Sequence, residues 1–425
     1  MNTKTNLFQI ARNTAISIFL AVTCGILIMI GLYSINTDNI QRHVKTSIPV
    51  YQQEHLYFFI SPNIHSTMLD NLSDAIMLNI AAYKGERTFK SIKNNALLNP
   101  RYEYKNLSPY DSLIKAYSQT DDSYEIISYP RYWHGYLLYL KPLLLFFNLG
   151  EIRCINMAVQ LLLLFLVILE LYKKGGRNLI LPYLCAIYVL NPLSTALCLT
   201  FSSMYYITLI GTLVMLKKEI YKSPDYFYFF LWLGILTPFF DFLTYPLIGL
   251  GINLIILTAL SDSQNPIKRV FSSLLFWITG YISMGSAKWI SVSILTKQNI
   301  MNNGFSQFIH RINGTENFLQ QYTIADVIKS NLNALINKPF CMLIICVLIY
   351  FIYLLISKKY QFKFDLNKNT ALLLITLFPF IWFILIQNHS IVHHWFVHKD
   401  FAVTVMALVY ILISSFNHNC DEEKF

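Results

Sequence analysis

An apolar run, Asn13–Ser34, opens the chain and is followed by a long polar and aromatic segment, Ile35–Arg131. The run contains no charged residue and is long enough to cross a bilayer as a helix, which takes about 20 residues. We therefore expect the first span to carry a large folded segment on one face of a membrane. Because the later connections between apolar runs are shorter, we expect polar chemistry to gather in this first segment.

The composition indicates an all-α, polytopic membrane protein. Of the 425 residues, 55% are hydrophobic and only 13% are charged, which is too few charges to cover a soluble globule. We predict about ten spans from the apolar runs of suitable length. These runs are Asn13–Ser34, Glu151–Tyr172, Asn178–Asn191, Ser194–Leu216, Tyr226–Phe239, Tyr245–Leu260, Val270–Leu295, Pro339–Ser357, Thr370–Gln387 and Phe401–Ser415.

The basic residues set the expected orientation. The formal net charge of +10 lies in alternate connections rather than in one patch, which favours the positive-inside rule over nucleic-acid binding. Both termini are then cytoplasmic and the long polar segments face outward. A composition rich in Ile, Asn and Lys is typical of AT-rich bacterial genomes, so we expect a bacterial cytoplasmic (inner) membrane. The basic connections contain Lys173, Lys174, Arg177, Lys217, Lys218, Lys222, Lys268, Arg269, Lys358, Lys359, Lys363 and Lys368.

We expect one membrane domain over residues 1–425 with two outward elaborations, 35–150 and 296–338. The first ends in Tyr132–Asn148, which is apolar but contains Lys141 and Pro142. Counting this stretch as a span would reverse the orientation of everything after it, so we predict an interfacial or re-entrant helix. The cysteines avoid both long polar loops, which predicts no disulfide framework. They are Cys24, Cys154, Cys185, Cys198, Cys341, Cys346 and Cys420.

Two carboxylates in the first outward segment are candidate catalytic groups. The stretch Leu69–Leu78 is typical of a helix start, which places Asp70 and Asp74 on one face at i,i+4 spacing. Like charges at that spacing repel, so such a pair suits a site that binds a cation, takes up a proton or accepts hydrogen bonds from a substrate. The alternative is that Asp70 caps the helix and Asp74 is a solvated acid near the helix dipole.

Two further outer stretches contain candidate substrate-binding residues. Arg131 and His134 lie in the aromatic stretch Tyr129–Tyr136, at the expected depth of the lipid headgroups. Arg pairs with phosphate through a planar fork, which would suit a lipid-linked phosphate, although membrane anchoring alone explains the aromatic residues. Asp241 is the only charge between two apolar runs, and is either a functional carboxylate or the N-cap of the following span.

The segment Asn388–Asp400 contains four of the ten histidines, in pairs at i,i+4 spacing. That spacing can place two imidazoles on one metal ion, but the two pairs face different sides of a helix. We therefore predict no metal site and expect His389 and His394 to bind substrate hydroxyls or phosphates. A divalent cation stays an open option, and no other cofactor is expected.

Several cations are predicted to lie near the outer ends of the spans. Lys399, in the last outer turn, is a candidate for binding the substrate phosphate. Lys288 is a candidate for an outward anion site, and singly its long side chain can also snorkel to the headgroups. The same alternatives hold for Lys141, Arg153 and Arg311. The chain has no GxxxxGK[ST], GxGxxG after a strand, HExxH or GxSxG motif, which disfavours nucleotide-driven transport by this chain alone.

The layout resembles the GT-C class of membrane glycosyltransferases, which take a sugar from a polyprenyl-phosphate carrier on the outer face of the membrane. In that class the first outer loop is long, bears interfacial helices and supplies a catalytic acid. The local strings LDNLSDAIML, YPRYWHGY with KPLLLFF, FFDFLTYP and NHSIVHHWFVHKD are similar to those of bacterial surface-polysaccharide membrane proteins of this kind. Many such enzymes place the acid soon after the first span, where this chain has Asp38, so Asp38, Asp70 and Asp74 all stay candidates for the base.

The resemblance implies transfer of a sugar from a polyprenyl-phosphate donor to a growing surface glycan. Asp70 or Asp74 would remove the proton of the acceptor hydroxyl, and Arg131, Lys288 and Lys399 would hold the departing phosphate. One alternative is an O-antigen-type polymerase that joins whole oligosaccharide repeats. The other is a non-enzymatic flippase or transporter of lipid-linked glycans, which would favour charges in the middle of the bilayer.

Overall fold

The computed structural model describes residues 3–118, 123–313, 322–357, 360–362 and 364–418. It is 77% helical, which confirms the all-α class. Within these residues, seven helical stretches are apolar and long enough to cross a membrane, so the prediction of a polytopic membrane protein is also confirmed. Three shorter apolar helices accompany them, and the count of ten spans stays a prediction. The seven stretches are Leu7–Tyr33, Leu149–Lys173, Leu199–Lys217, Pro266–Thr296, Lys338–Ile356, Leu366–Leu385 and His394–Ser414.

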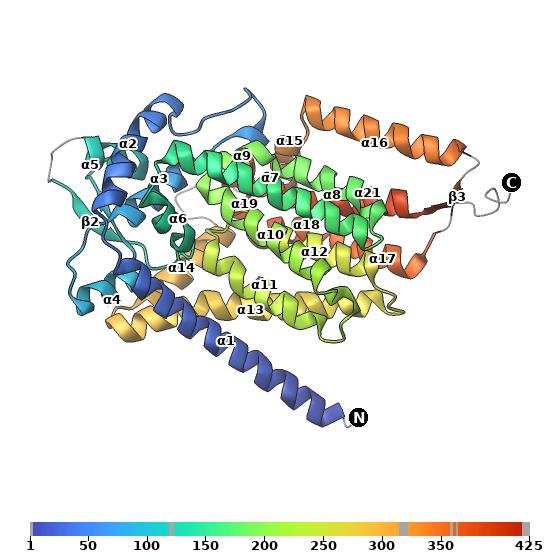
Figure 1. Ribbon diagram of the computed structural model, residues 1–425, viewed down its shortest axis with the longest axis horizontal. Coiled ribbons are helices and arrows are strands. Elements are labelled where there is room, and N and C mark those ends of the chain that lie inside the picture. Colours follow the sequence, from blue (N-terminus) through green and yellow to red (C-terminus); the bar gives the residue numbers. More distant parts are fainter. Residues whose placement is uncertain (1–2, 119–122, 314–321, 358–359, 363, 419–425) are drawn as a thin grey trace.

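The apolar helices form a bundle with its long axis horizontal in Figure 1. Its long and short apolar helices are α1 (Thr3–Tyr33), α7 (Leu149–Lys173), α8 (Arg177–Leu190), α10 (Leu199–Lys217), α11 (Tyr226–Phe240), α12 (Leu247–Leu260), α13 (Pro266–Thr296), α16 (Lys338–Ile356), α17 (Leu366–Thr376), α18 (Phe378–Leu385) and α21 (Phe401–Ser414). Short helices α9 (Pro192–Leu197) and η2 (Ile220–Lys222) join some of them. The helices α10 and α12 are the most enclosed, whereas α1 and α16 expose large apolar side chains to the surroundings.

Most predicted runs coincide with helices, and three differ. The run Ser194–Leu216 is divided between α9 and α10 at Cys198, whose backbone is extended. The helix α1 begins at Thr3 rather than Asn13, because hydropathy marks the apolar part of a helix and not its end. The predicted run Thr370–Gln387 is divided between α17 and α18 at Leu377, just before Pro379, whose ring lacks the amide donor that would continue the helix. Elsewhere the ends are capped as expected, as where Asn148 and Glu151 form a capping box at the start of α7.

The first long polar segment is a folded unit at one end of the bundle, on the left of Figure 1. It has its own apolar core, which includes Val44, Leu78 and Leu113, and a two-stranded antiparallel sheet in which Pro100 pairs with Ser128. We call this end the loop side. The unit comprises α2 (Asp38–Glu54), η1 (His65–Thr67), α3 (Asn71–Ala82), α4 (Phe89–Leu98), β1 (Pro100–Glu103), α5 (Pro109–Ser118), β2 (Glu125–Ser128) and α6 (Leu137–Leu144).

The predicted interfacial helix Tyr132–Asn148 is shorter and more enclosed than expected. Only α6 is helical, and Leu137, Leu140 and Leu144 are buried against the loop-side core. The aromatic stretch before α6 is held to α11 instead, since Gly135 donates its backbone N–H to Phe239 O at 2.8 Å. This contact brings Tyr129–Tyr136 next to the turn that follows α11.

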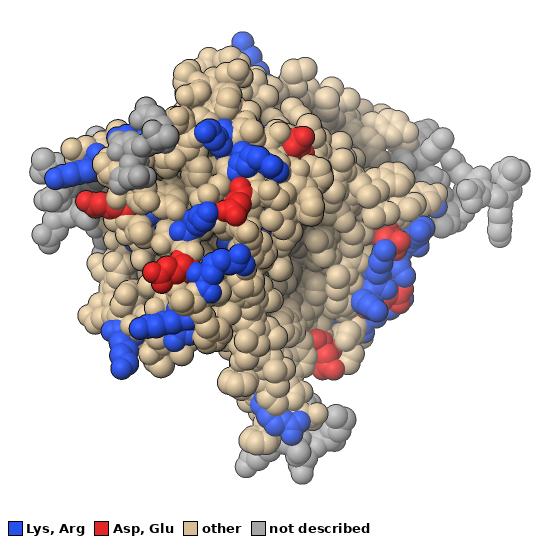
Figure 2. All heavy atoms as spheres, turned by 60° about the vertical axis from the view of Figure 1, so that its left-hand side comes forward, with Lys and Arg blue, Asp and Glu red and all other residues tan. Residues whose placement is uncertain are grey.

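The second polar segment also folds at the loop side. It supplies α14 (Ile300–Asn313) and α15 (Ile324–Leu335), which pack against the histidine-rich segment α19 (Gln387–Val392), α20 (His394–Val397) and η3 (His398–Asp400). Figure 2 shows the loop side in front, with Lys and Arg side chains spread over it among acidic ones. The polar chemistry therefore converges at one end of the bundle.

The opposite end contains the predicted basic connections. Lys174 pairs with Glu219 at 2.7 Å and Arg269 donates to Tyr221 O at 3.1 Å, so these connections lie together. The predicted pair of Glu170 with Lys173 is present at 3.4 Å. Strands β3 (Tyr360–Phe362) and β4 (Phe416–His418) pair at this end, where the first residues of α1 also lie (Figure 1). The predicted residues Lys358, Lys359, Lys363 and Cys420 lie outside the described part of the chain.

Candidate functional site

Asp70 lies at the start of α3, at the loop side. Its carboxylate accepts hydrogen bonds from Ser73 N at 3.1 Å and Ser73 Oγ at 2.7 Å, so it is the N-cap of the helix, as one prediction held. Burial raises the pKa of Asp70 to about 6, although the bonds from Ser73 oppose this shift. Burial is the larger cause that raises the pKa of the nearby Tyr57, and the Asp70 charge raises this pKa further. Asp70 is therefore poised to exchange a proton near neutral pH.

Asp74 has a different environment from Asp70. It is fully buried and accepts hydrogen bonds from Leu199 N at 2.8 Å, Thr200 N at 2.9 Å and Thr200 Oγ1 at 2.7 Å. These are the free donors at the start of α10, so Asp74 joins the loop-side unit to the centre of the bundle. The expectation that Asp74 is a solvated acid is wrong, because its side chain points into the protein and accepts hydrogen bonds from the start of α10.

A row of aromatic rings connects the first outward segment with α19 and α20. Tyr57 contacts Trp395 with ring centroids 5.4 Å apart, and His65 contacts His394 at 5.3 Å. Buried ring nitrogens in this row, among them His65 Nδ1, His393 Nδ1 and Trp395 Nε1, have no hydrogen-bond partner among the described residues. Unpaired buried donors and acceptors are costly, which makes this row a candidate site for a polar ligand.

His389 and Arg311 form the cationic part of the site. Arg311 donates to His389 Nδ1 at 2.6 Å and to Tyr132 OH at 2.5 Å, and His389 Nε2 lies 2.7 Å from Leu243 O. Since the carbonyl requires a donor, His389 carries its proton on Nε2 and is neutral. Burial and the Arg311 charge hold the pKa of His389 well below its usual value. Arg311 was predicted as part of an outward anion site or as a snorkelling cation, and its partners could not be predicted because they are distant in sequence.

Asp241 lies in the buried turn after α11. It accepts a hydrogen bond from Thr244 N at 3.0 Å and another from Thr244 Oγ1, and burial raises its pKa to about 6 despite these bonds. One alternative was that Asp241 caps the following helix, and this alternative is wrong. The start of α12 is bound by Asp400 instead, whose Oδ1 accepts from Leu247 N at 3.0 Å. The second oxygen of Asp400 is buried without a partner among the described residues.

Of the two candidates in the aromatic stretch, only Arg131 has an available side chain. Its guanidinium carbon lies 5.1 Å from the Tyr129 ring centroid, and the side chain is partly exposed. His134 is buried, with Nε2 2.8 Å from Tyr129 O and Nδ1 3.1 Å from Tyr136 OH. Because both ring nitrogens are occupied, His134 has a structural role and holds this segment in its conformation.

The candidate lysines do not snorkel to the surface. Lys288 is buried and donates to Leu97 O and Asn99 Oδ1, each at 2.9 Å. Lys399 is buried and donates to Leu190 O at 2.7 Å, Ser66 O at 2.9 Å and Ser194 Oγ at 2.9 Å. These acceptors include carbonyls at the ends of α4 and α8, which occupy both ammonium groups. The prediction of snorkelling is therefore wrong for Lys288.

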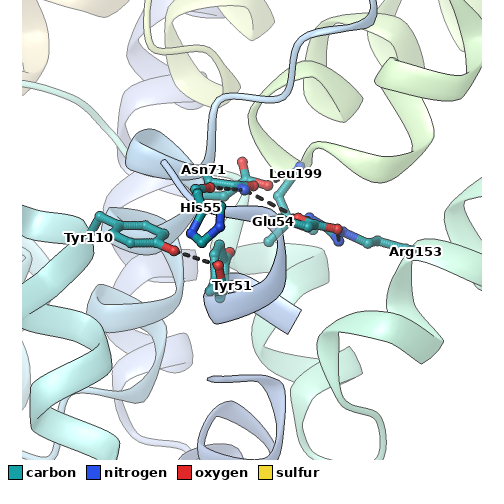
Figure 3. A network of polar contacts seen from close by, with 8 residues as sticks. Tyr51, Glu54, His55, Asn71, Tyr110, Arg153 and Leu199 are labelled. Carbon is teal, nitrogen blue, oxygen red and sulfur yellow. Dashed lines mark hydrogen bonds and ion pairs between the residues drawn. The ribbon is translucent and has the colours of Figure 1, made fainter. Parts of the chain in front are cut away.

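Lys141 and Arg153 are also buried rather than snorkelling. Lys141 donates to Leu32 O at 3.2 Å, at the end of α1. Arg153 of α7 makes a two-pronged ion pair with Glu54 of α2, at 2.5 and 3.0 Å. Figure 3 shows Glu54 between Arg153 and Asn71, which donates to the same carboxylate at 3.2 Å. This network, unpredicted from the sequence, fixes the loop-side unit on the bundle.

An apolar groove of about 720 Å³ lies along the side of the bundle. Four helices, α6, α7, α10 and α11, line it, and Phe240 at its rim directly precedes Asp241. The lining along α10 extends from Ser203 to Val214, roughly 16 Å at 1.5 Å per residue. Several lining side chains, including Val159, Ile210 and Trp232, are exposed, so the groove opens sideways toward lipid.

Within the described residues, no group of three or more His, Cys, Asp or Glu side chains could hold a metal ion. Asp70, Arg131, His394 and Arg311 lie at the loop side, whereas the polar atoms of Asp74, His134, Asp241, His389, Lys288 and Lys399 are occupied by backbone or neighbouring groups. The predicted candidates thus divide into an available set and a structural set. No family model, no curated protein and no solved structure matches this chain.

Proposed function

We propose that the protein is a membrane glycosyltransferase that moves a sugar from a polyprenyl-phosphate donor to a surface glycan, on the extracytoplasmic face. The observation that supports the proposal is that one bundle has both a lateral apolar groove, whose lining ends at Phe240 directly before Asp241, and a polar, cation-bearing site at its loop side. A substrate with a long hydrocarbon tail and an anionic, hydroxyl-rich head has this same division. The basic connections at the other end support an extracytoplasmic loop side.

The groove suits the hydrocarbon tail of such a donor. It is lined almost wholly by apolar side chains, and its few polar groups lie toward the loop side, where Tyr139 OH and Ser203 Oγ are 2.9 Å apart. A tail in the groove would leave its head beside the turn that contains Asp241. The phosphate would then lie at the depth of the headgroups, where charged side chains are tolerated.

Arg311 and Arg131 are the cations best placed to hold the phosphate. Arg311 has a planar guanidinium that is fixed by His389 and Tyr132, and fixed donors stabilise the charge of a departing phosphate most effectively. Arg131 belongs to the same stretch as Tyr132 and is partly exposed. Lys288 and Lys399 are not part of this proposal, because their ammonium groups are bound to helix ends.

Asp70 is the carboxylate that we assign as general base. A base works best when its pKa lies near the working pH, and burial raises the pKa of Asp70 to about 6. Its carboxylate would take the proton of the acceptor hydroxyl while the oxygen attacks the anomeric carbon, and the lipid phosphate would leave with the bonding electrons. Asp74 is disfavoured as the base, because three hydrogen bonds from α10 already stabilise its charge.

The two carboxylates therefore give opposite expectations when each is replaced by Asn. Asp70→Asn should abolish the surface glycan while the protein stays at its normal abundance in the membrane. Asp74→Asn should lower the abundance, because the start of α10 loses a charged acceptor. Glycan staining and immunoblotting of the same cells separate these outcomes, with the exposed Glu86→Gln as control. Normal glycan at normal abundance in Asp70→Asn would reject the base.

A further inference from the structure

The helix α14 has three distinct faces. At about 100° per residue, its residues separate into a buried stripe, an exposed apolar stripe and an exposed polar stripe. The buried stripe contains the buried Ile300 and Gly304 and the partly buried Gln307 and Arg311. The exposed apolar stripe contains Met301, Phe305, Phe308 and Ile309, and the polar stripe contains the exposed Asn302, Asn303 and Ser306, with the partly buried His310 at its edge.

The buried stripe packs closely on the bundle. A Cβ at Gly304 would lie 2.6 Å from the Trp289 ring of α13, so only glycine permits this approach. Ile300 joins a small apolar cluster with Val292 and Leu97. The helix is therefore held beside the loop-side end of α13, which ends at Thr296, and it starts only four residues later at Ile300.

Neither protein packing nor water accounts for the apolar stripe. Phe305 is 61% exposed, and Met301, Phe308 and Ile309 are exposed as well. Four large apolar side chains in one stripe would be costly in water, at about 25 cal/mol for each Å² of exposed apolar surface. The adjacent polar stripe excludes a position deep in the hydrocarbon, since its amides and hydroxyl would lack partners there.

We propose that α14 lies in the plane of the membrane and binds the lipid leaflet on the loop side. Its apolar stripe enters the boundary between headgroups and acyl chains, its polar stripe faces water, and its buried stripe faces the protein. The packing of Gly304 on Trp289 of α13 holds α14 at the loop-side end of the bundle, next to the expected outer boundary of the leaflet. The same helix supplies Arg311, so the leaflet would also set the level of the guanidinium that contacts His389 and Tyr132.

A photocrosslinking experiment on the full chain tests this proposal. The probe p-benzoylphenylalanine, which resembles phenylalanine in shape, is introduced at Phe305, at Phe308 or at Ser306 as the matched control. The protein is reconstituted in vesicles of phosphatidylethanolamine and phosphatidylglycerol and irradiated. Mass spectrometry then measures the fraction of protein that carries a phospholipid adduct.

The probes at Phe305 and Phe308 should give severalfold more phospholipid adduct than the probe at Ser306. Equal adduct at all three positions, or adduct only at Ser306, would overturn the proposal, as would crosslinks from Phe305 to a second protein chain in place of lipid. The readout needs no enzymatic activity. A negative crosslinking result would leave the assignment of Asp70 as the base untouched. Likewise, rejection of Asp70 as the base would leave the proposed membrane position of α14 untouched.

Discussion

Buried charged residues in this protein are matched to the ends of helices. The ammonium groups of Lys141, Lys288 and Lys399 lie against carbonyls near the ends of α1, α4 and α8. The carboxylates of Asp74 and Asp400 accept from the first amides of α10 and α12. A helix has partial positive charge at its start and partial negative charge at its end, so each of these five buried charges meets its opposite. For these five residues the helix ends replace the ion pairs that buried charges otherwise require.

Replacing Lys399 with Met should therefore destabilise the protein rather than remove a substrate contact. The carbonyls of Leu190 and Ser66 would lose a buried donor, at a cost of about 1–3 kcal/mol. Thermal unfolding in lipid nanodiscs measures the loss, with the exposed Lys45→Met as control. An unchanged melting temperature together with lost glycan would instead return Lys399 to the substrate site.

The buried carboxyl of Asp241 should make stability depend on pH. Its folded pKa of about 6 is above the ordinary value of 3.8, so folding favours its protonated form. This contribution is complete below pH 3.8 and is lost as pH rises through 6. The melting temperature of Asp241→Asn minus that of the wild type should therefore rise between pH 4 and pH 7. The exposed Asp225→Asn should show no such trend, and a flat difference for Asp241→Asn would refute the buried ionisation.

Sequence reasoning found which residue types matter but not which partners they have. Asp70 as a helix N-cap could be predicted, because a cap is decided by the neighbouring three residues. Arg311 and Tyr132 are 179 positions apart, and Lys288 and Leu97 are 191 apart, so no local pattern indicates these contacts. The missed residues are those whose role is set by packing between segments distant in the chain.

At the scale of elements, α11 and α13 approach each other through a pair of glycines. A Cβ at Gly234 would lie 2.1 Å from Trp277 O, and one at Gly280 would lie 2.3 Å from Leu231 O. Backbones can come this close only where neither residue has a side chain, as small residues permit between membrane helices. The turn with Asp241 follows α11 directly, so this crossing also positions part of the candidate site.

Gly280→Ala should force these two helices apart. We expect a loss of about 1–3 kcal/mol, as is usual for added volume in a close-packed contact. Gly285→Ala, one to two turns further along α13, is the control, because nothing lies within 4 Å of a Cβ there. Melting temperatures in nanodiscs compare the two variants. Equal effects at both positions would mean that helix propensity, and not the crossing, decides the result.

The elements themselves were largely predictable, because a membrane span needs a long apolar run and leaves that run visible in the sequence. The segment around α6 was not, since burial inside the loop-side unit and exposure to the lipid interface both favour apolar residues. The composition of Tyr132–Asn148 fits both a buried segment and an interfacial helix. The contact of Gly135 with Phe239 O places this segment inside the protein. Composition gives hydrophobicity, but it does not say which apolar surroundings a segment enters.

At the scale of the whole molecule, the ion pair of Glu54 with Arg153 joins the loop-side unit to the bundle. Both side chains are largely buried, with 17% and 5% exposed, and Asn71 supports the same carboxylate. Removing one partner leaves a buried charge unpaired, which costs about 3–5 kcal/mol, whereas removing both can be nearly neutral. The pair thus adds to the helix packing and to the hydrogen bonds of Asp74 with α10 that also join the two parts.

Arg153→Met alone should therefore be more harmful than the double variant Glu54→Leu with Arg153→Met. Hydrogen exchange of α2 and α3, measured by mass spectrometry, should accelerate strongly in the single variant and recover in the double one. Arg42→Met, at an exposed position of α2, serves as the control. Additive effects of the two replacements would show that the charges are solvated separately and do not couple the two parts.

The sideways opening of the groove determines how a molecule could arrive there. Its mouth faces acyl chains and not the aqueous phase, so entry would take place by two-dimensional diffusion within the leaflet. Occupancy would then follow the mole fraction of the guest among the surrounding lipids, and the volume of the cell or test tube would not matter. Diluting the membrane with inert phospholipid should slow turnover, while diluting the vesicle suspension with buffer should leave it unchanged.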